Sequence, residues 1–380
     1  MDRMHIQIGV GGRFHADRMA ATFLGAGHRV ELFTTFPSSR FPIIPKEVIH
    51  SFTLPEVVFR LAQVMGSEHW GDQIKLSWFG KKMAQSIARA QSADLFIGWS
   101  SFSLETLRTR QAGRHVVVRD SAHIAYQYDL LKEEYRKFGR TFPDRQFCLE
   151  RELEEYDRAD SIVVLSDFAK KTFVEKGISA SKVDVLRLGA DTSVFHPSAD
   201  RLAQLPLKAV YFGQLSIKKG IHYLLEATRD LKHLELTLVG SVDPDFRPLL
   251  QKYSHAQIHK PMAHPQLASF IREFDLFVFP TLEDGFGQTL IQAMASGLVS
   301  VVTDNCGAAE RMEDAGVIVP IRDAFALRTA LQKFIENPQL LPAMKHKAVA
   351  LARRYSWATY SADVLAWAIH KDAQIKQAIS

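Results

Sequence analysis

The sequence predicts an α/β protein built from two doubly wound, Rossmann-like domains that face each other across a cleft. Three observations support this fold class. The chain has 380 residues, which is long for one core and suits two domains of about 150–200 residues each. Short apolar runs alternate with helical patterns, as in βαβ units with parallel sheets. The alternation stops near residues 196–200 and then starts again, which indicates a linker.

The first unit opens with an apolar strand over 5–10 and a helix over 13–27, which ends in C-cap fashion at Gly25 or Gly27. Further apolar runs end where polar residues begin, and they predict strands over 28–35, 93–100, 114–120, 160–166 and 182–191. We therefore assign residues 1–196 to an N-terminal domain.

The second unit repeats the alternation. It has apolar runs over 207–215, 234–241, 275–281 and 298–304, and helical patterns over 220–230 and 289–297. These residues predict a C-terminal domain over 197–356. The stretch 355–380 is amphipathic and no strand follows it, so we expect a helix over 357–380 that crosses back to the N-terminal domain.

Composition narrows the class of protein. A hydrophobic fraction of 47% and a charged fraction of 23% are those of a soluble globular protein. No apolar run reaches the ~20 residues of a membrane span, and no secretory signal is visible at the N-terminus. Cys148 and Cys306 are isolated, which suits a reducing compartment and forms neither a disulfide framework nor a zinc site. We expect a cytoplasmic protein.

The net charge of +5 is mild, and no nucleic-acid-binding motif accompanies it, so we expect no nucleic-acid partner. Basic residues gather between Lys75 and Arg114, and the segment 75–90 combines Trp78 and Phe79 with lysines and Arg89. Such a helix suits peripheral contact with an anionic membrane at the inner face of the plasma membrane. An ordinary solvated helix face explains the same charges equally well.

The loop after the first strand, Gly9–Arg18, is rich in glycine, and Gly11 and Gly12 could let backbone amides approach an anion. As a dinucleotide fingerprint it fails, because Phe14 stands where G-x-G-x-x-G needs its last glycine. No acidic residue closes the second strand either. Glycines that make a tight turn are an equally good interpretation of this loop.

A second polar loop follows the strand at 207–212. Gly213 ends the strand, and Lys218 and Lys219 come just before a helix. Two ammonium groups at the carboxyl end of a strand could neutralise a diphosphate as it leaves with growing negative charge. Solvated lysines beside a helix start are the alternative.

The third and most specific segment is Pro280–Gly297. Its strand ends in a loop that carries Glu283 and Asp284, the next three residues allow close backbone approach, and a helix begins at about Gln288. Gly285, Phe286 and Gly287 form the close-approach loop, and the amides of Gln288, Thr289 and Leu290 are expected to form an anion site. A carboxylate can accept hydrogen bonds from sugar hydroxyls, and the Gln292 amide can address a ribose diol.

This segment resembles the E-x7-E region of retaining glycosyltransferases of family 4, which have the GT-B fold. The likeness extends over nearly the whole chain, through the segments 11–35, 119–139, 159–177, 185–197, 212–220 and 306–323. Two departures stand out. The pair reads D-x7-Q here, with Asp284 and Gln292, and Gln214 replaces the arginine usual in the phosphate loop.

The resemblance implies a metal-independent glycosyltransferase that uses a UDP- or GDP-sugar as donor and holds no prosthetic group. It implies that a hexose or related sugar is transferred to a glycan, lipid-linked or small-molecule acceptor, as in polysaccharide biosynthesis. His123, Asp284 and Lys219 are then the catalytic candidates. Gly213, Lys218 and the residues from Glu283 to Gln292 named above would bind the donor, and Gly11, Gly12 and His123 would line the acceptor side.

Three alternatives stay open. Asp243-x-Asp245 could suggest a metal, but Pro244 between the acids favours a turn. A nucleotide-sugar epimerase or a phosphorylase could use the same fold, since fold does not fix function. The D-x7-Q pair and Gln214 also fit an inactive glycosyltransferase-like binding subunit.

Overall fold

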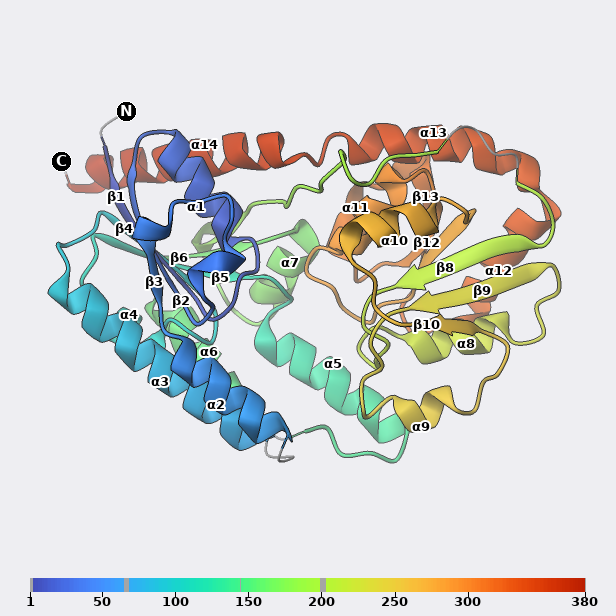
Figure 1. The fold of residues 1–380 in the computed structure, drawn as a ribbon, viewed down its shortest axis with the longest axis horizontal. Coiled ribbons are helices and arrows are strands. Elements are labelled where there is room, and N and C mark those ends of the chain that lie inside the picture. Colours follow the sequence, from blue (N-terminus) through green and yellow to red (C-terminus); the bar gives the residue numbers. More distant parts are fainter. Residues whose placement is uncertain (1–2, 65–67, 144, 199–202, 380) are drawn as a thin grey trace.

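The computed structural model describes residues 3–64, 68–143, 145–198 and 203–379. Within these ranges the chain forms two parallel sheets, one in each half of the molecule (Figure 1). The first has the strand order β3-β2-β1-β4-β5-β6-β7 and the second β10-β9-β8-β11-β12-β13. In both sheets the order reverses beside the first strand, so each domain is doubly wound, as the sequence predicts.

The N-terminal sheet consists of β1 (His5–Val10), β2 (Arg29–Thr34), β3 (Ile49–Ser51), β4 (Leu95–Trp99), β5 (Arg114–Arg119), β6 (Ser161–Val164) and β7 (Val183–Val185). Its helices are α1 (Ala16–Gly25), α2 (Thr53–Val64), α3 (Glu68–Arg89), α4 (Leu104–Thr109), α5 (Ile124–Lys137), α6 (Gln146–Arg158) and α7 (Asp167–Glu175). Most of these strands are buried along their length, and their apolar residues run without the alternation of a one-sided sheet.

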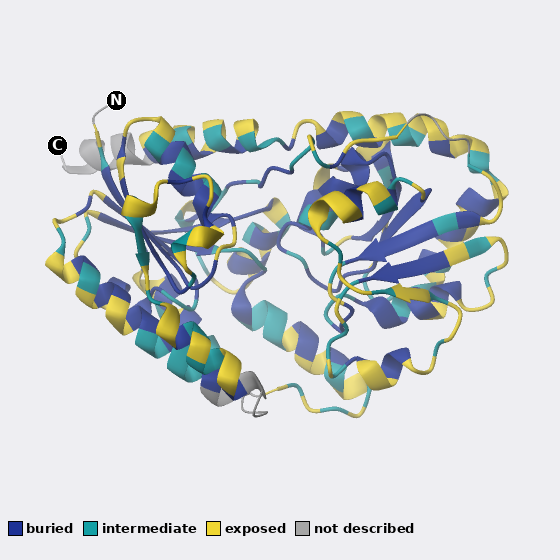
Figure 2. Ribbon diagram, viewed as in Figure 1, coloured by how far each residue is buried: buried dark blue, intermediate teal, exposed yellow. Residues whose placement is uncertain are grey.

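The C-terminal sheet consists of β8 (Leu207–Phe212), β9 (Leu234–Val239), β10 (Gln257–His259), β11 (Leu276–Phe279), β12 (Val299–Thr303) and β13 (Gly316–Val319). Its helices are α8 (Ile221–Thr228), α9 (Arg247–Leu250), α10 (His264–Ile271), α11 (Gln288–Ala295), α12 (Ala324–Glu336) and α13 (Leu341–Ala352). Figure 2 shows that buried residues concentrate on the strands of both sheets, while the outer helices alternate between buried and exposed positions.

The last helix, α14 (Trp357–Ile379), lies against the N-terminal domain, in line with α13 on the other domain (Figure 1). The hydroxyls of Thr22 on α1 and Ser361 on α14 are 2.8 Å apart. The indole of Trp367 donates to Asp184 at 3.0 Å, and its ring lies under the guanidinium of Arg114. The final helix thus returns to the first domain.

Two expectations need correction. The strand expected over 182–191 is only Val183–Val185, because the chain then leaves the sheet to pass between the domains. The side chain of Phe79, expected on a membrane-facing surface, is fully buried in the N-terminal core. Lys75 of the same helix is also engaged, because its ammonium lies 2.7 Å from the carboxylate of Glu56.

Candidate active site in the cleft between the domains

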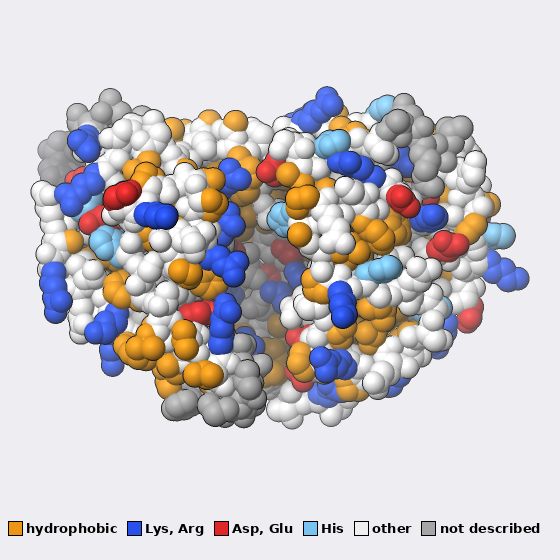
Figure 3. Space-filling model, in the orientation of Figure 1, with side chains coloured by type: hydrophobic (Ala, Val, Ile, Leu, Met, Phe, Trp, Pro, Cys, Tyr) orange, Lys and Arg blue, Asp and Glu red, His pale blue; other side chains and the backbone are white. Residues whose placement is uncertain are grey.

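Two adjoining cavities lie between the domains. One has a volume of about 400 Å³ and the other of about 370 Å³, and Phe14, Asp120 and Asp284 line both. Figure 3 shows the molecule deeply hollowed between its two halves, with Lys and Arg side chains along the wall of the N-terminal domain. Ligands of open parallel sheets bind outside the carboxyl ends of the strands, which is where these cavities lie.

Asp284 organises the loop between β11 and α11. Its Oδ1 accepts hydrogen bonds from the amides of Gly287 at 2.7 Å and Phe286 at 3.2 Å. Its Oδ2 accepts one from the ammonium of Lys219 at 2.5 Å. Burial alone would lower the pKa of Lys219, but the attraction of Asp284 and Glu283 outweighs it and raises that pKa. Lys219 is therefore a cation held at the loop.

Glu283 contacts the opposite domain. Its fully buried carboxylate accepts hydrogen bonds from the Ser121 hydroxyl and the Ala122 amide, both at 2.7 Å, and from the Gln127 amide group at 2.6 Å. The Lys218 ammonium lies 3.0 Å away. Burial raises the pKa of Glu283, but Lys218 and these hydrogen bonds outweigh it and bring it to about 2. Glu283 thus ties the donor-side loop to the N-terminal domain.

The loop after β8 packs tightly against the loop after β11. Gly220 has a φ of +65°, and a Cβ there would lie 1.9 Å from the carbonyl oxygen of Pro280. Gly213 has a φ of +142°, which side chains rarely allow. The amide of Leu282 donates to the carbonyl of Lys218 at 3.0 Å. These contacts set the two lysines beside Glu283 and Asp284, where both side chains are only partly exposed.

Helix α11 begins beneath the first cavity. The amides of Gln288 and Thr289 have no hydrogen-bond partner among the described residues, as an anion site requires. The Leu290 amide was expected to be free, but it donates to the carbonyl of Gly287 at 2.9 Å because the first helical turn tightens there. Gln292 is mostly buried and lines this cavity.

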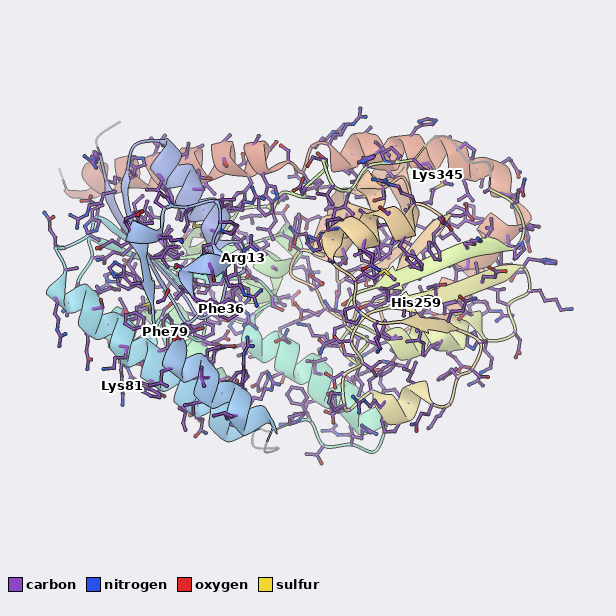
Figure 4. The ribbon with its side chains drawn as sticks, in the orientation of Figure 1. Arg13, Phe36, Phe79, Lys81, His259 and Lys345 are labelled. Carbon is purple, nitrogen blue, oxygen red and sulfur yellow. The ribbon has the colours of Figure 1, made fainter. Side chains whose placement is uncertain are left out.

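On the N-terminal side, the glycine loop borders the cleft through other residues than expected. A Cβ on Gly11 would lie 1.8 Å from the ring of Phe102, so this glycine permits close packing. Gly12 accepts a hydrogen bond at its carbonyl from Thr34. Neither glycine lines the two cavities. Arg13 does line the first, and Figure 4 labels it at the edge of the N-terminal domain that faces the cleft.

His123 caps helix α5, because its Nδ1 accepts a hydrogen bond from the amide of Ala125 at 3.2 Å. Its ring packs against Tyr156 and Phe173, and it is 2% exposed. Burial, with help from the charge of Arg119, lowers the pKa of His123 to about 4. The structure therefore holds His123 neutral in the domain core and does not bring it to the walls of these two cavities.

Sequence reasoning missed a pair in the cleft. Asp120 follows β5, its Oδ2 accepts a hydrogen bond from the indole of Trp99 at 3.0 Å, and its Oδ1 lies 3.6 Å from Nδ1 of His15. Burial lowers the pKa of His15 although Asp120 opposes this. The available signal was the position of Asp120, a carboxylate at the carboxyl end of a predicted strand.

Helix α5 spans the interface between the domains. Glu134 on this helix is fully buried and accepts hydrogen bonds from the Tyr223 hydroxyl at 2.7 Å and from the His222 ring at 3.0 Å. Arg322 of the C-terminal domain lies 2.8 Å from the same carboxylate. Burial raises the pKa of Glu134, but His222 and Tyr223 outweigh it and bring it to about 2. A charged network on α5 therefore joins the two domains.

The described residues contain no group of three or more His, Cys, Asp or Glu side chains placed to hold a metal ion. Asp243 instead makes a turn, since its Oδ1 accepts a hydrogen bond from the amide of Asp245 at 2.9 Å. Within the same part of the chain, every helix is too short or too polar to cross a bilayer.

Two facing Rossmann-like domains, with a charged loop and a helix start on one side of the cleft, define a protein of the GT-B fold. Two family models match the chain, one for each domain: Glycosyltransferase Family 4 over residues 11–194 and Glycosyl transferases group 1 over residues 206–337. Together they span most of the chain, which belongs to this glycosyltransferase family.

Relatives and solved structures agree with this assignment. The D-inositol 3-phosphate glycosyltransferase of Corynebacterium kroppenstedtii is 26% identical over 287 residues, or 67% of this chain and 63% of that protein. The amylovoran biosynthesis glycosyltransferase AmsK of Erwinia amylovora is 24% identical over 65% of this chain and 62% of its own. The chain spans about half to two thirds of the length of the curated relatives it matches.

Two solved structures share the fold over almost the whole chain. The sucrose-phosphate synthase of Thermosynechococcus elongatus superposes with a TM-score of 0.73 at 19% identity, covering 98% of this chain and 100% of that one. HepE of Anabaena, solved with UDP-glucose, superposes with a TM-score of 0.67 at 18% identity, covering 97% and 100%.

Proposed function

We propose that the protein transfers a hexose or related sugar from a UDP- or GDP-linked donor to a hydroxyl of a glycan, lipid-linked or small-molecule acceptor. One observation carries the proposal. Asp284, Gln288 at the start of α11 and the Gln292 side chain line the first interdomain cavity, and Lys219, which pairs with Asp284, lines the adjoining second cavity; the amides of Gln288 and Thr289 have no partner among the described residues. A cation with free amides at a helix start suits a diphosphate. HepE, which has the same fold, binds UDP-glucose.

The donor would lie along the first cavity with its parts in order. Lys219 and the amides of Gln288 and Thr289 would take the diphosphate, and Gln292 the ribose. Asp284 would face the transferred sugar and accept hydrogen bonds from its hydroxyls, in addition to those from Lys219 and the loop amides. As the bond between sugar and phosphate breaks, negative charge grows on the leaving diphosphate, and a fixed cation stabilises that charge without reorganising.

The acceptor would enter the second cavity, whose N-terminal wall includes Asp120 and Ser121. Asp120 lies at the junction of both cavities, where an acceptor hydroxyl would have to meet the sugar. Its hydrogen bond from Trp99 fixes the carboxylate, so it could orient that hydroxyl. We propose retention of the anomeric configuration by same-face attack, with the leaving phosphate oxygen taking the acceptor proton.

We also propose that the N-terminal domain contacts an anionic membrane, through helix α2 in place of Phe79. Leu54, Val57 and Leu61 form an exposed apolar stripe on α2, with 56%, 49% and 57% of their surfaces exposed. Lys81 on the adjacent α3 is exposed, and Figure 4 labels it at the outer edge of the domain. Apolar side chains with flanking cations suit an anionic interface. This face would bring a lipid-linked acceptor near the cleft.

The decisive experiment incubates the purified protein with a panel of UDP- and GDP-hexoses and measures release of the nucleoside diphosphate, with and without candidate acceptors. We expect one donor to be consumed, in EDTA as well as in Mg²⁺, and a product whose anomeric NMR coupling matches that of the donor. No turnover with any donor would refute the transferase. Loss of turnover in EDTA that Mn²⁺ or Mg²⁺ restores would refute metal independence.

A further inference from the structure

A separate cavity of about 330 Å³ lies where the chain passes twice between the domains. The first crossing, after β7, carries Arg187 and Leu188, and the second, between α13 and α14, carries Arg354 and Tyr355. The crossings are joined, because the amide of Ala190 donates to the carbonyl of Tyr355 at 2.8 Å. We call this space the crossover cavity.

Three arginines from separate segments of the chain converge on the crossover cavity. They are Arg187, Arg311 and Arg354. Arg187 pairs with Asp167 and, at 3.2 Å, with Glu310, yet its Nε is buried without a hydrogen-bond partner among the described residues. Neither Arg311 nor Arg354 makes an ion pair with any residue that the structure describes. Guanidinium groups bind phosphate oxygens through paired N–H donors, so three of them in one cavity favour a phosphate ligand.

The rest of the wall offers acceptors. Glu313 and Asp363 line the cavity, and neither carboxylate is paired with a described cation. A purely inorganic anion would be repelled by these two groups, whereas sugar hydroxyls would donate hydrogen bonds to them. The volume lies at the lower end of the range for small-molecule sites, about 300–1,000 Å³. Arginines and carboxylates together therefore suit a ligand that carries both a phosphate and several hydroxyls.

We propose that the crossover cavity binds a phosphorylated sugar, at a site distinct from the donor cleft. The inference does not rest on the proposed transferase activity. Leu188 lines both this cavity and the first cleft cavity, and the ring of Tyr355 lies against Phe286 of the donor-side loop at 5.8 Å. A ligand that touches both crossings would have different affinities for closed and open arrangements of the domains, and would shift the balance between them.

The test measures binding of glucose 6-phosphate to the full chain by isothermal titration, without nucleotide sugar. The variant is Arg311→Gln with Arg354→Gln, and the matched control is Arg353→Gln, an exposed arginine next to Arg354 that does not line the cavity. Lys219→Ala reports on phosphate bound at the donor site instead. We expect the double variant to bind at least about tenfold more weakly, and both other variants to bind like the wild type.

Three results would overturn the proposal. The first is no binding to the wild type at millimolar ligand. The second is loss of binding in Lys219→Ala with the double variant unaffected, which would place the phosphate in the donor cleft. The third is binding of inorganic phosphate as tightly as glucose 6-phosphate, which would leave no role for the hydroxyls. Thermal melting of each variant confirms that a loss of binding does not come from unfolding.

Discussion

Asp284 uses both carboxylate oxygens, so substitutions there separate its charge from its hydrogen bonds. Asn keeps an oxygen for the amides of Phe286 and Gly287 but loses the ionic partner of Lys219. We expect Asp284→Asn to depress turnover strongly. Gln292 is expected to contact the nucleoside, where binding is similar in ground and transition states. Gln292→Ala should therefore mainly weaken donor binding, by about 1–2 kcal/mol, and so raise the donor KM. Steady-state kinetics measures both.

The variant Gln292→Glu serves as the control for that pair, because a carboxylate can still accept hydrogen bonds from a ribose diol. We expect it to be tolerated. If Gln292→Ala damages turnover more than Asp284→Asn does, the roles of the two residues are reversed.

Lys219 and Lys218 lie next to each other but have different partners. Lys219 pairs with Asp284, which lines both cavities, whereas Lys218 pairs with Glu283 at the domain contact. We expect Lys219→Ala to lower turnover on the order of 10²-fold, the scale for removing one charge-stabilising group. Lys218→Ala should do less to turnover and more to stability. The matched control is Lys232→Ala, because Lys232 is exposed. Near-normal turnover in both variants would mean that the diphosphate binds elsewhere.

Glu283 should make stability depend on pH in a defined window. Its pKa is about 2 in the folded protein and 4.5 ordinarily, so folding favours its charged form. Its contribution is complete above about pH 4.5 and is lost as pH falls toward 2, and a shift of this size corresponds to roughly 3 kcal/mol. We expect Glu283→Gln to be less stable than the wild type by that order at pH 7.

Urea unfolding of both proteins at pH 7, 4 and 3 measures that difference directly. Comparing the two proteins at each pH cancels the titration of the other carboxylates. The difference should shrink steadily below pH 4.5, because the wild-type carboxyl then takes up a proton. A gap that stays constant down to pH 3 would show that the charge on Glu283 is not what stabilises the domain contact.

At the scale of elements, continuous apolar runs predict most strands, because buried parallel strands are apolar throughout. Helical patterns predict the first helix of each domain. The end of the strand over 182–191 could not be predicted, since its residues leave the sheet only to meet Tyr355 on a distant part of the chain. The burial of Phe79 could not be predicted either. A helix that carries Trp78, Phe79 and several lysines is amphipathic, and the sequence alone does not say which face packs on the core.

Helix α2 now carries the membrane prediction. Replacing Leu54 and Leu61 by Ser should weaken co-sedimentation with anionic vesicles, because the exposed apolar area that inserts is removed. Binding should also fall as salt is raised, since Lys81 would act by charge. The control is Phe325→Ser, which removes a highly exposed aromatic ring from the other domain. Equal binding by the double variant and the wild type would remove α2 from the contact.

At the scale of the whole molecule, the facing domains were predictable because each sheet repeats one pattern. Which residues line the cleft was only partly predictable. Asp284, Lys219 and Gln292 reach it from segments whose spacing can be recognised. Asp120 follows β5 and His15 follows β1, two strands that lie on either side of β4 in the folded sheet, and His123 lies in the core because it caps α5. The pattern of residues along one sequence does not show which distant residues come into contact in this way.

The return of α14 to the first domain also gives a prediction. Trp367 is 8% exposed and anchors that helix, so Trp367→Ala should cost about 3–5 kcal/mol of unfolding free energy. The exposed Ile369 provides the control, with Ile369→Ala within about 1 kcal/mol. Amide hydrogen exchange locates the damage, and protection should fall mainly in β1–β7. An equal loss in β8–β13 would mean that α14 stabilises both domains alike.

That return has a consequence for biosynthesis. Helix α14, which covers α1, is translated after the whole C-terminal sheet, some ten to thirty seconds after β7 at usual elongation rates. The C-terminal sheet is complete before the N-terminal domain is. During that interval the nascent first domain exposes the apolar surface that α14 later buries, and it is a natural client for chaperones that bind chains during translation.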